Sequence, residues 1–287
     1  MHRIDSHHHL WDLTVRPQTW QVGNKFDPVR RNFDISDLKS AISDTGITHT
    51  YLVQTVMNYD ETPELLVTAN ENEIILGVTG WLKIDSPDAI ENLARYEELP
   101  GAKYLKGIRD IAHDYPDPNY LSKPQVITNC KELGRQDYVY ELLTKTEQMN
   151  AAIELVKSVP NTLFVLDHIS KPLIATGELE PWATNIRTLA KFENLYCKVS
   201  GMITEAKWKN WKPSDYRPYF EIVIENFGAD RIMYGSDWPV ALLSGTYKDV
   251  YDLAEYLTNS LSESEKQKFW CDNAKKVFDL EINSQKI

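Results

Sequence analysis

Short apolar runs alternate with longer amphipathic segments along the whole chain. Eight of these runs have the near-continuous apolar character of parallel strands that are covered on both faces, as in TYLVQTV and TLFVLDH. We expect the strands at 3–9, 48–55, 74–82, 103–109, 138–143, 163–168, 195–200 and 231–237. The pattern therefore predicts strands that alternate with helices.

Helical periodicity follows most of these strands. Asp34 can cap a helix that runs through ISDLKSAISDTG and stops at Gly46. Further helical patterns are TPELLVTANEN, SPDAIENLARYEEL, MNAAIELVKSV and SDYRPYFEIVIENFG, and SESEKQKFWCDNAKKVFDL predicts a terminal helix packed on the outside. Because no repeat or Gly/Ser linker interrupts the chain, we expect one domain over residues 1–287. This order predicts an α/β fold, a (β/α)8 TIM barrel rather than an open doubly wound sheet.

Two connections are long and lack a clear pattern. They cover residues 11–31, after the first expected strand, and residues 110–134, after the fourth. In a barrel such βα connections lie at the C-terminal face, where active sites form. We therefore expect both to form pocket walls or lids.

Charge and cysteine content narrow the function classes. The 31 basic and 42 acidic residues give a net charge of −11, which argues against a nucleic-acid partner. An anionic small substrate stays open, because one arginine can reverse the field inside a pocket. Three scattered cysteines predict reduced thiols, and no apolar stretch predicts a signal peptide or membrane span, so we expect a cytoplasmic protein.

Histidines gather at the start of the chain, in the segment RIDSHHHLW. Side chains alternate along a strand, so His7 and His9 share one face while His8 takes the other. Two imidazoles on one face can bind one ion or one substrate oxygen. Solvated histidines at a polar strand end are the alternative, and spacing alone leaves both open.

Three further candidates end other expected strands. These are Arg109 in YLKGIRD, His168 in FVLDHISKP and Asp237 in RIMYGSDWPV. Singly, each has a structural explanation: an interlayer ion pair, a satisfied histidine and an aspartate in a turn. A barrel would bring all of them around one mouth with His7 and His9. A carboxylate beside imidazoles can complete a metal shell or act as a general base toward water.

Four motifs in order resemble a known family. They are Asp5-Ser-His7-His-His9-Leu-Trp11, Lys106-Gly-Ile-Arg109, Leu166-Asp-His168-Ile-Ser-Lys171-Pro172 and Gly235-Ser-Asp237-Trp238-Pro239. With this set the chain resembles the amidohydrolase superfamily (amidohydrolase family 2), in the sugar-acid lactonase branch. The segments CKVSGMITEAKWKNWKPSDYRPY and GSDWPVALL are most similar to L-fuconolactonase-like and L-rhamnonolactonase-like proteins.

The resemblance implies a hydrolase that acts on a carboxylic ester, with water as nucleophile. Asp237 would be the general base, His168 a second catalytic group, and Arg109 would grip the substrate. His7, His9 and Asp237 would hold a metal, with His168 as an additional ligand. No lysine is placed to bridge two ions, so at most one divalent ion, Zn or Mn, is expected, and metal-independent catalysis stays open.

Further substrate contacts are expected around this site. Gln54 ends an apolar strand and must find a partner or face the pocket, and Glu205 follows the seventh strand, where an exposed loop position is the alternative. Trp11 and Trp238 could stack on a sugar ring, although ordinary packing explains each tryptophan equally well.

The predicted substrate is an aldonolactone, such as L-fuconolactone or L-rhamnonolactone, opened to its aldonic acid in carbohydrate catabolism. Three alternatives stay open. They are a metal-dependent decarboxylase of the same superfamily, a hydrolase of another lactone such as 2-pyrone-4,6-dicarboxylate, and a non-catalytic sugar-acid binding protein. The sequence leaves the choice of lactone undecided and is compatible with a homo-oligomer.

Overall fold

Eight parallel strands pair in sequence order from β1 to β8, each with the next, in a computed structural model that describes residues 2–282. All eight lie within or at most one residue beyond the segments expected from the apolar pattern. Their bounds are β1 Ile4–His8, β2 His49–Val53, β3 Ile75–Trp81, β4 Leu105–Asp110, β5 Val139–Leu142, β6 Phe164–Leu166, β7 Leu195–Val199 and β8 Ile232–Tyr234.

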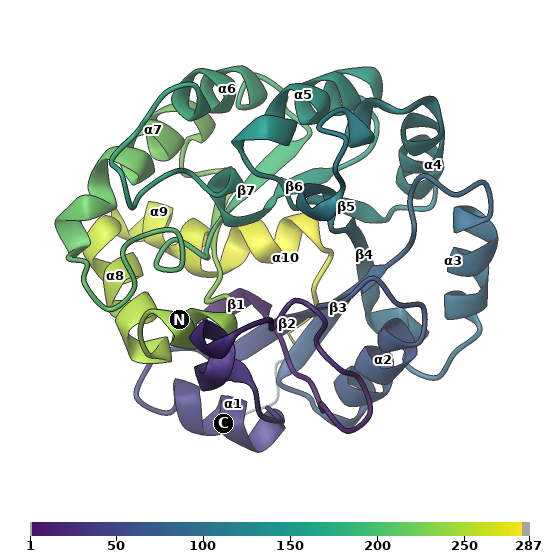
Figure 1. Cartoon of the computed structure of the whole chain (residues 1–287), viewed down its shortest axis with the longest axis horizontal. Helices are drawn as coiled ribbons and strands as arrows, with labels where there is room; N and C mark the ends of the chain where they lie inside the picture. Colours follow the sequence, from purple (N-terminus) through teal and green to yellow (C-terminus); the bar gives the residue numbers. More distant parts are fainter. Residues whose placement is uncertain (1, 283–287) are drawn as a thin grey trace.

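The ring closes where the segment after β8 meets β1. The Asp237 amide donates to the His7 carbonyl at 2.8 Å, and the His9 amide donates to the Trp238 carbonyl at 2.7 Å. Helices surround the strands, as Figure 1 shows. The prediction of a (β/α)8 TIM barrel is confirmed.

The covering helices follow the strands in order. They are α1 Ile35–Ile42, α2 Glu61–Glu71, α3 Ala89–Glu97, α4 Pro124–Arg135, α5 Met149–Ser158, α6 Trp182–Leu189, α7 Arg217–Phe227 and α8 Tyr247–Leu257. Asp34 caps α1 in a capping box with Asp37, as expected, but the helix ends at Ile42, before Gly46. No helix in the described part of the chain has the length and apolarity to cross a membrane.

The second long connection is less irregular than expected. Residues 110–134 contain most of α4, which starts with Pro124 in the first turn and buries Val126, Cys130 and Leu133. The apolar residues of this stretch are spaced at helical intervals. The glycine and asparagines among them have low helix propensity, so the sequence did not indicate a helix clearly. The helices α6 and α8 were also missed.

The terminal helical segment does not lie on the outside of the ring, so that expectation was wrong. It comprises α9 Glu263–Gln267, a π-helical turn Lys268–Asp272 and α10 Asn273–Val277. Figure 1 shows α10 crossing the ring of strands. Phe278, just after α10, stacks on the inward-facing Tyr51 with ring centroids 4.2 Å apart. This segment therefore closes the N-terminal end of the barrel.

The barrel interior changes from apolar to charged toward its open end. The apolar layer next to Phe278 includes Tyr51, Val139, Val165 and Met233. Above it the strands direct ionisable side chains inward, and above these lies the cavity described next. The assignment of residues 1–287 to one domain stays a prediction, because residues 1 and 283–287 lie outside the described part.

Candidate active site

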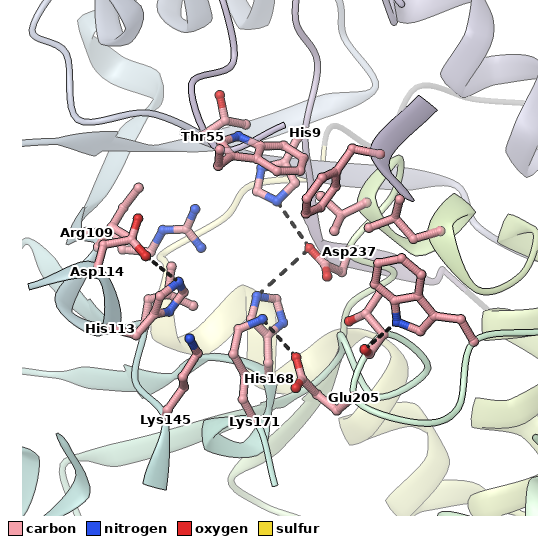
Figure 2. A pocket seen from close by; sticks show the side chains of 18 residues that line it. His9, Thr55, Arg109, His113, Asp114, Lys145, His168, Lys171, Glu205 and Asp237 are labelled. Atoms are coloured by element: carbon pink, nitrogen blue, oxygen red, sulfur yellow. Dashed lines mark hydrogen bonds and ion pairs between the residues drawn. The ribbon is translucent and has the colours of Figure 1, made fainter. Parts of the chain in front are cut away.

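A cavity of about 290 Å³ opens at the C-terminal ends of the strands. Figure 2 shows its polar side chains converging from separate strand ends. Its aromatic wall comes from Trp20 and Phe26 in the first long connection and from Trp208. The polar lining consists of His9, Thr55, Arg109, His113, Asp114, Lys145, His168, Lys171, Thr204, Glu205 and Asp237. The expectation that both long connections contribute to the pocket wall is confirmed.

His9 and Asp237 form the central pair. Nδ1 of His9 lies 2.7 Å from the Val53 carbonyl oxygen. A carbonyl oxygen only accepts, so Nδ1 carries a hydrogen. Nε2 faces Oδ1 of Asp237 at 3.2 Å. A proton or a metal ion between these two atoms would join them.

His168 approaches the same carboxylate from the other side of the barrel. Its Nε2 lies 3.9 Å from Oδ1 of Asp237, and its Nδ1 lies 2.8 Å from the Ser200 hydroxyl. The hydroxyl fixes the ring orientation from behind. Nε2 of His168 therefore points toward Asp237, as Figure 2 shows.

The turn that carries His168 is strained. Residues 168–171 all have positive φ, between 47° and 62°, and each such residue costs about 1–2 kcal/mol when it is not glycine. The Trp182 indole donates to the Ile169 carbonyl at 2.6 Å, and the hydroxyls of Thr144 and Ser170 lie 2.7 Å apart. These contacts offset the strain of the turn. The strained conformation directs the His168 side chain into the cavity.

Gly201 gives His168 the space that it needs. It has φ +61°, and a Cβ there would lie 2.6 Å from Nδ1 of His168. We expect Gly201→Ala to displace the His168 ring and to lower activity at least tenfold. Gly177→Ala is the matched control, because Gly177 also has a positive φ, +77°, but a Cβ there meets nothing within 4 Å.

Steady-state rates and urea unfolding of the two variants separate these effects. Both variants share the backbone cost of a left-handed alanine, about 1–2 kcal/mol, so this cost should lower the unfolding free energy of both by a similar amount. Only Gly201→Ala should also lose turnover. Equal turnover in the two variants would show that His168 does not need this position.

Asp5 holds the Asp237 turn against β1. Its carboxylate accepts from the amides of Ser236 (2.8 Å) and His7 (3.1 Å). It also accepts from the hydroxyls of Ser236 (2.6 Å) and Tyr247 (2.9 Å). Burial raises the pKa of Asp5 to about 6, although these hydrogen bonds oppose the rise. The first residue of the D-x-H motif is therefore structural, and it joins the two chain segments that supply His7 and Asp237.

His7 lies deeper than His9 and contacts Arg109. Nε2 of His7 lies 3.3 Å from Nη1 of Arg109, which also donates to Oδ2 of Asp167 at 2.9 Å. Arg109 and the Lys198 ammonium, which lies 3.2 Å from Nδ1, both only donate, so a neutral His7 ring can accept from one of them at a time. Nδ1 faces Oδ1 of Asp167 at 3.4 Å. Arg109 also donates to the backbone carbonyl of Gln54.

A fully buried charged layer lies beneath these groups, and the sequence reasoning missed it. Nζ of Lys198 lies 2.6 Å from Oε2 of Glu141 and 3.4 Å from Oδ1 of Asp167. With Arg109 the layer holds two cations and two carboxylates, so its formal charge is balanced. Glu141 and Lys198 are polar residues at inward positions of β5 and β7, and that alternation is the signal that could have revealed them.

The amidohydrolase family model matches residues 4–280. The chain belongs to the amidohydrolase family. It is similar to two L-fucono-1,5-lactonases: one from Burkholderia ambifaria, 31% identical over 86% of this chain and 83% of the relative, and one from Burkholderia multivorans, 30% identical over 97% and 96%. A crystal structure of a Burkholderia multivorans amidohydrolase with bound Zn has a TM-score of 0.91, with 29% identity over 98% of this chain and all of that chain.

The donor atoms of this amidohydrolase fit a divalent ion. His7, His168 and Asp237 offer ligand atoms that all lie within 4.8 Å of one another. Oδ2 of Asp237 is buried and has no hydrogen-bond partner among the described residues. Burial lowers the pKa values of His7 and His168 well below 6.5, so both rings are neutral and present lone pairs. Imidazole and carboxylate donors suit Zn²⁺ and Mn²⁺.

Of the four remaining residues predicted to contact the substrate, one lines the cavity of the amidohydrolase and three do not. Glu205 lines the cavity and pairs with Lys171 at 3.1 Å. Gln54, Trp11 and Trp238 are buried outside the cavity lining. Gln54 donates to the Arg109 carbonyl at 3.2 Å, the Trp11 indole to the Arg31 carbonyl at 2.8 Å. For these three a substrate contact stays a prediction, and their observed contacts are structural.

The cavity also contains groups that sequence reasoning missed or gave little weight. Lys145 and Lys171 join Arg109 on one wall, and burial together with these cations lowers the pKa of the neighbouring His113 to about 2. A neutral His113 can accept a hydrogen bond from a substrate hydroxyl. His8, which alternation predicts on the opposite face from His7 and His9, is fully buried, and burial lowers its pKa to about 3.

Proposed function

We propose that this amidohydrolase opens a sugar-acid lactone, such as L-fucono-1,5-lactone or an L-rhamnonolactone, to the aldonic acid. The observation that carries the proposal is the Asp237 carboxylate, which lies at the cavity floor between His9 and His168 with one oxygen free. A carboxylate in this position can take a proton from water in a cavity large enough for one sugar ring. Relatives named L-fucono-1,5-lactonase, 30–31% identical over most of the chain, support this substrate class.

Asp237 acts first as a general base. It removes a proton from the water as the water oxygen bonds to the lactone carbonyl carbon. The carbonyl oxygen then gains negative charge, and His168 and Arg109 are the cavity groups that can stabilise it. Donors of this kind are each worth about 2.7–4 kcal/mol in the transition state.

The bond between the carbonyl carbon and the ring oxygen then breaks. Protonated Asp237 returns its proton to the departing ring oxygen, which becomes a hydroxyl of the product. The net reaction adds one water, and the product carboxylic acid ionises near neutral pH. Lysines 145 and 171, with Arg109, give the acidic protein a locally basic wall beside that carboxylate.

A divalent ion in this site would be held by His7, His168 and Asp237, with His9 adjacent. When bound, it would polarise the carbonyl and lower the pKa of water. His9 and His168 keep their ring orientations through Val53 and Ser200 in either case. Zn and Mn are the ions we propose.

Lactone opening can be tested in a pH-stat, because each turnover releases one proton from the new carboxylic acid. We would compare L-fucono-, L-rhamnono-, L-galactono- and D-arabinono-lactones, each with and without a chelator and with Zn²⁺ or Mn²⁺ restored. Stoichiometric acid release from at least one of them is expected. Release of CO₂ from an aromatic acid without lactone opening would instead indicate a decarboxylase. Tight binding without turnover in every arm would indicate a binding protein.

We also propose that the protein is cytoplasmic. A homo-oligomer is compatible with this proposal. The three cysteines are free and buried, which suits a reducing compartment. The partner that the relatives support is a small-molecule lactone.

A further inference from the structure

Lys198 occupies an unusual place for a lysine. Its ammonium group is fully buried inside the barrel, beneath the cavity. It lies 2.6 Å from Oε2 of Glu141, 3.2 Å from Nδ1 of His7 and 3.4 Å from Oδ1 of Asp167. The rings of Tyr51 and Phe278 lie 5.5 and 5.2 Å below it. Burying an isolated ammonium group is costly, so these partners must compensate for lost solvation.

The same three partners form a metal-binding set. His7, Glu141 and Asp167 offer one imidazole nitrogen and two carboxylate oxygens within 4.8 Å of one another. Two carboxylates and an imidazole are ordinary ligands for Zn²⁺ or Mn²⁺. In this barrel they surround a lysine nitrogen instead of an ion.

We propose that the ammonium group of Lys198 is a fixed cation in a second, metal-like position, and that it positions His7 for the site above. The two ring nitrogens of His7 face different cations of the charged layer. Nδ1 faces Lys198 and Asp167, whereas Nε2 faces Arg109. The Lys198 ammonium group below His7 keeps Glu141 and Asp167 in place without an exchangeable ion. The barrel then has room for one exchangeable ion, near Asp237.

Removal of the lysine should open the lower position to a real ion. We expect Lys198→Ala to bind one more Zn²⁺ per chain than the wild type, counted by elemental analysis after equilibration and by calorimetry. The count is made at pH 8, because burial raises the pKa of Glu141 to about 7 and the carboxylate must be charged. An unchanged count would overturn the proposal.

The matched control removes a ligand together with the lysine. Lys198→Ala/Glu141→Gln has the same enlarged space but lacks one carboxylate, so it should bind no additional ion. An equal gain in both variants would place the new ion elsewhere and contradict the proposal. If Lys198→Ala does not fold, the count is made on Lys198→His, which supplies a ligand in place of the cation. Failure of both variants to fold with Zn²⁺ present also contradicts it, because the ion should replace the lost charge.

The positioning of His7 rests on the function proposed above, whereas the ion count does not depend on any substrate. Metal-free Lys198→Ala should lose about 10–100-fold in kcat, as is common when a supporting contact of a site is removed, with little change in KM. Zn²⁺ should restore part of kcat in Lys198→Ala but not in the double variant. An extra ion without any wild-type lactone opening would refute the proposed function and leave the fixed-cation position intact.

Discussion

Replacement of Asp237 by asparagine is expected to lower kcat for lactone opening by about 10²–10⁴-fold, the usual contribution of a general acid–base group. Asparagine keeps the shape of the side chain but cannot take a proton from water or return one to the ring oxygen. The fold should survive. Asp237 has φ 56°, a left-handed conformation that asparagine tolerates well, and the amide that bonds to His7 is unchanged.

Proton release in a pH-stat measures the loss, and circular dichroism with urea unfolding checks the fold. Asp114→Asn is the matched control, because it makes the same chemical change in the same cavity, at a carboxylate whose side chain is 47% exposed. We expect that control to keep turnover within tenfold of the wild type. If Asp237→Asn keeps near-normal turnover, Asp237 is not the base.

Replacement of Arg109 by methionine should give the largest loss of stability, about 3–5 kcal/mol at pH 7, since it leaves a buried carboxylate without one of its cations. Arg109 donates to Asp167 at 2.9 Å, and both side chains are nearly inaccessible to solvent. Urea unfolding measures the change. Arg135→Met is the control, because Arg135 is 74% exposed in its pair with Glu132, and such a pair contributes at most about 1 kcal/mol.

The loss of stability in Arg109→Met should change with pH in a direction that the pKa of Asp167 determines. Burial alone would raise the pKa of Asp167, but Lys198, His7 and Arg109 outweigh it and hold that pKa well below 3.8. A lowered carboxylate pKa stabilises the fold above the unfolded-state pKa, and that stability is lost as pH falls through the native pKa. The difference between wild type and Arg109→Met should therefore be greatest near neutrality and shrink below about pH 4. A difference that stays constant into acid would show that Arg109 acts through packing alone.

The strands could be predicted from the sequence because their physical signal is local. A strand buried on both faces must be apolar almost throughout, and runs such as TLFVLDH show this directly. The end of α1 was placed too late because Gly46 is a strong stop signal, whereas the α-helix ends at Ile42. The terminal segment was placed outside because its amphipathic pattern does not say which surface it covers. That surface is the barrel floor, formed by residues distant in sequence.

The candidate site was predictable where a residue lies close to the end of a strand. His9, Arg109, His168 and Asp237 lie within three residues of the last residue of β1, β4, β6 and β8, and the barrel brings their side chains to one cavity. Polar residues within strands were harder to identify. Lys198 stands between apolar neighbours, so its strand looks structural until the fold places it opposite Glu141.

The contact of the motif tryptophans with a sugar ring stays a prediction, and in this fold they make packing contacts. Trp11 and Trp238 belong to the sequence motifs, yet both pack edge-on against Phe33. The ring centroid of Phe33 lies 5.4 Å from that of Trp11 and 5.3 Å from that of Trp238. The aromatic wall instead comes from Trp20 and Phe26, whose positions depend on how the first long connection folds back over the cavity. No sequence pattern specifies that return path.

The most direct test is a crystal structure of Asp237→Asn soaked with L-fucono-1,5-lactone. The lactone is expected in the cavity at the C-terminal end of the barrel, with its carbonyl carbon beside the residue 237 side chain and its carbonyl oxygen toward His168 or Arg109. A lactone bound elsewhere, for example in the groove between α2 and residues 10–18, would contradict the proposed active site. So would a lactone in the cavity with its carbonyl turned away from residue 237.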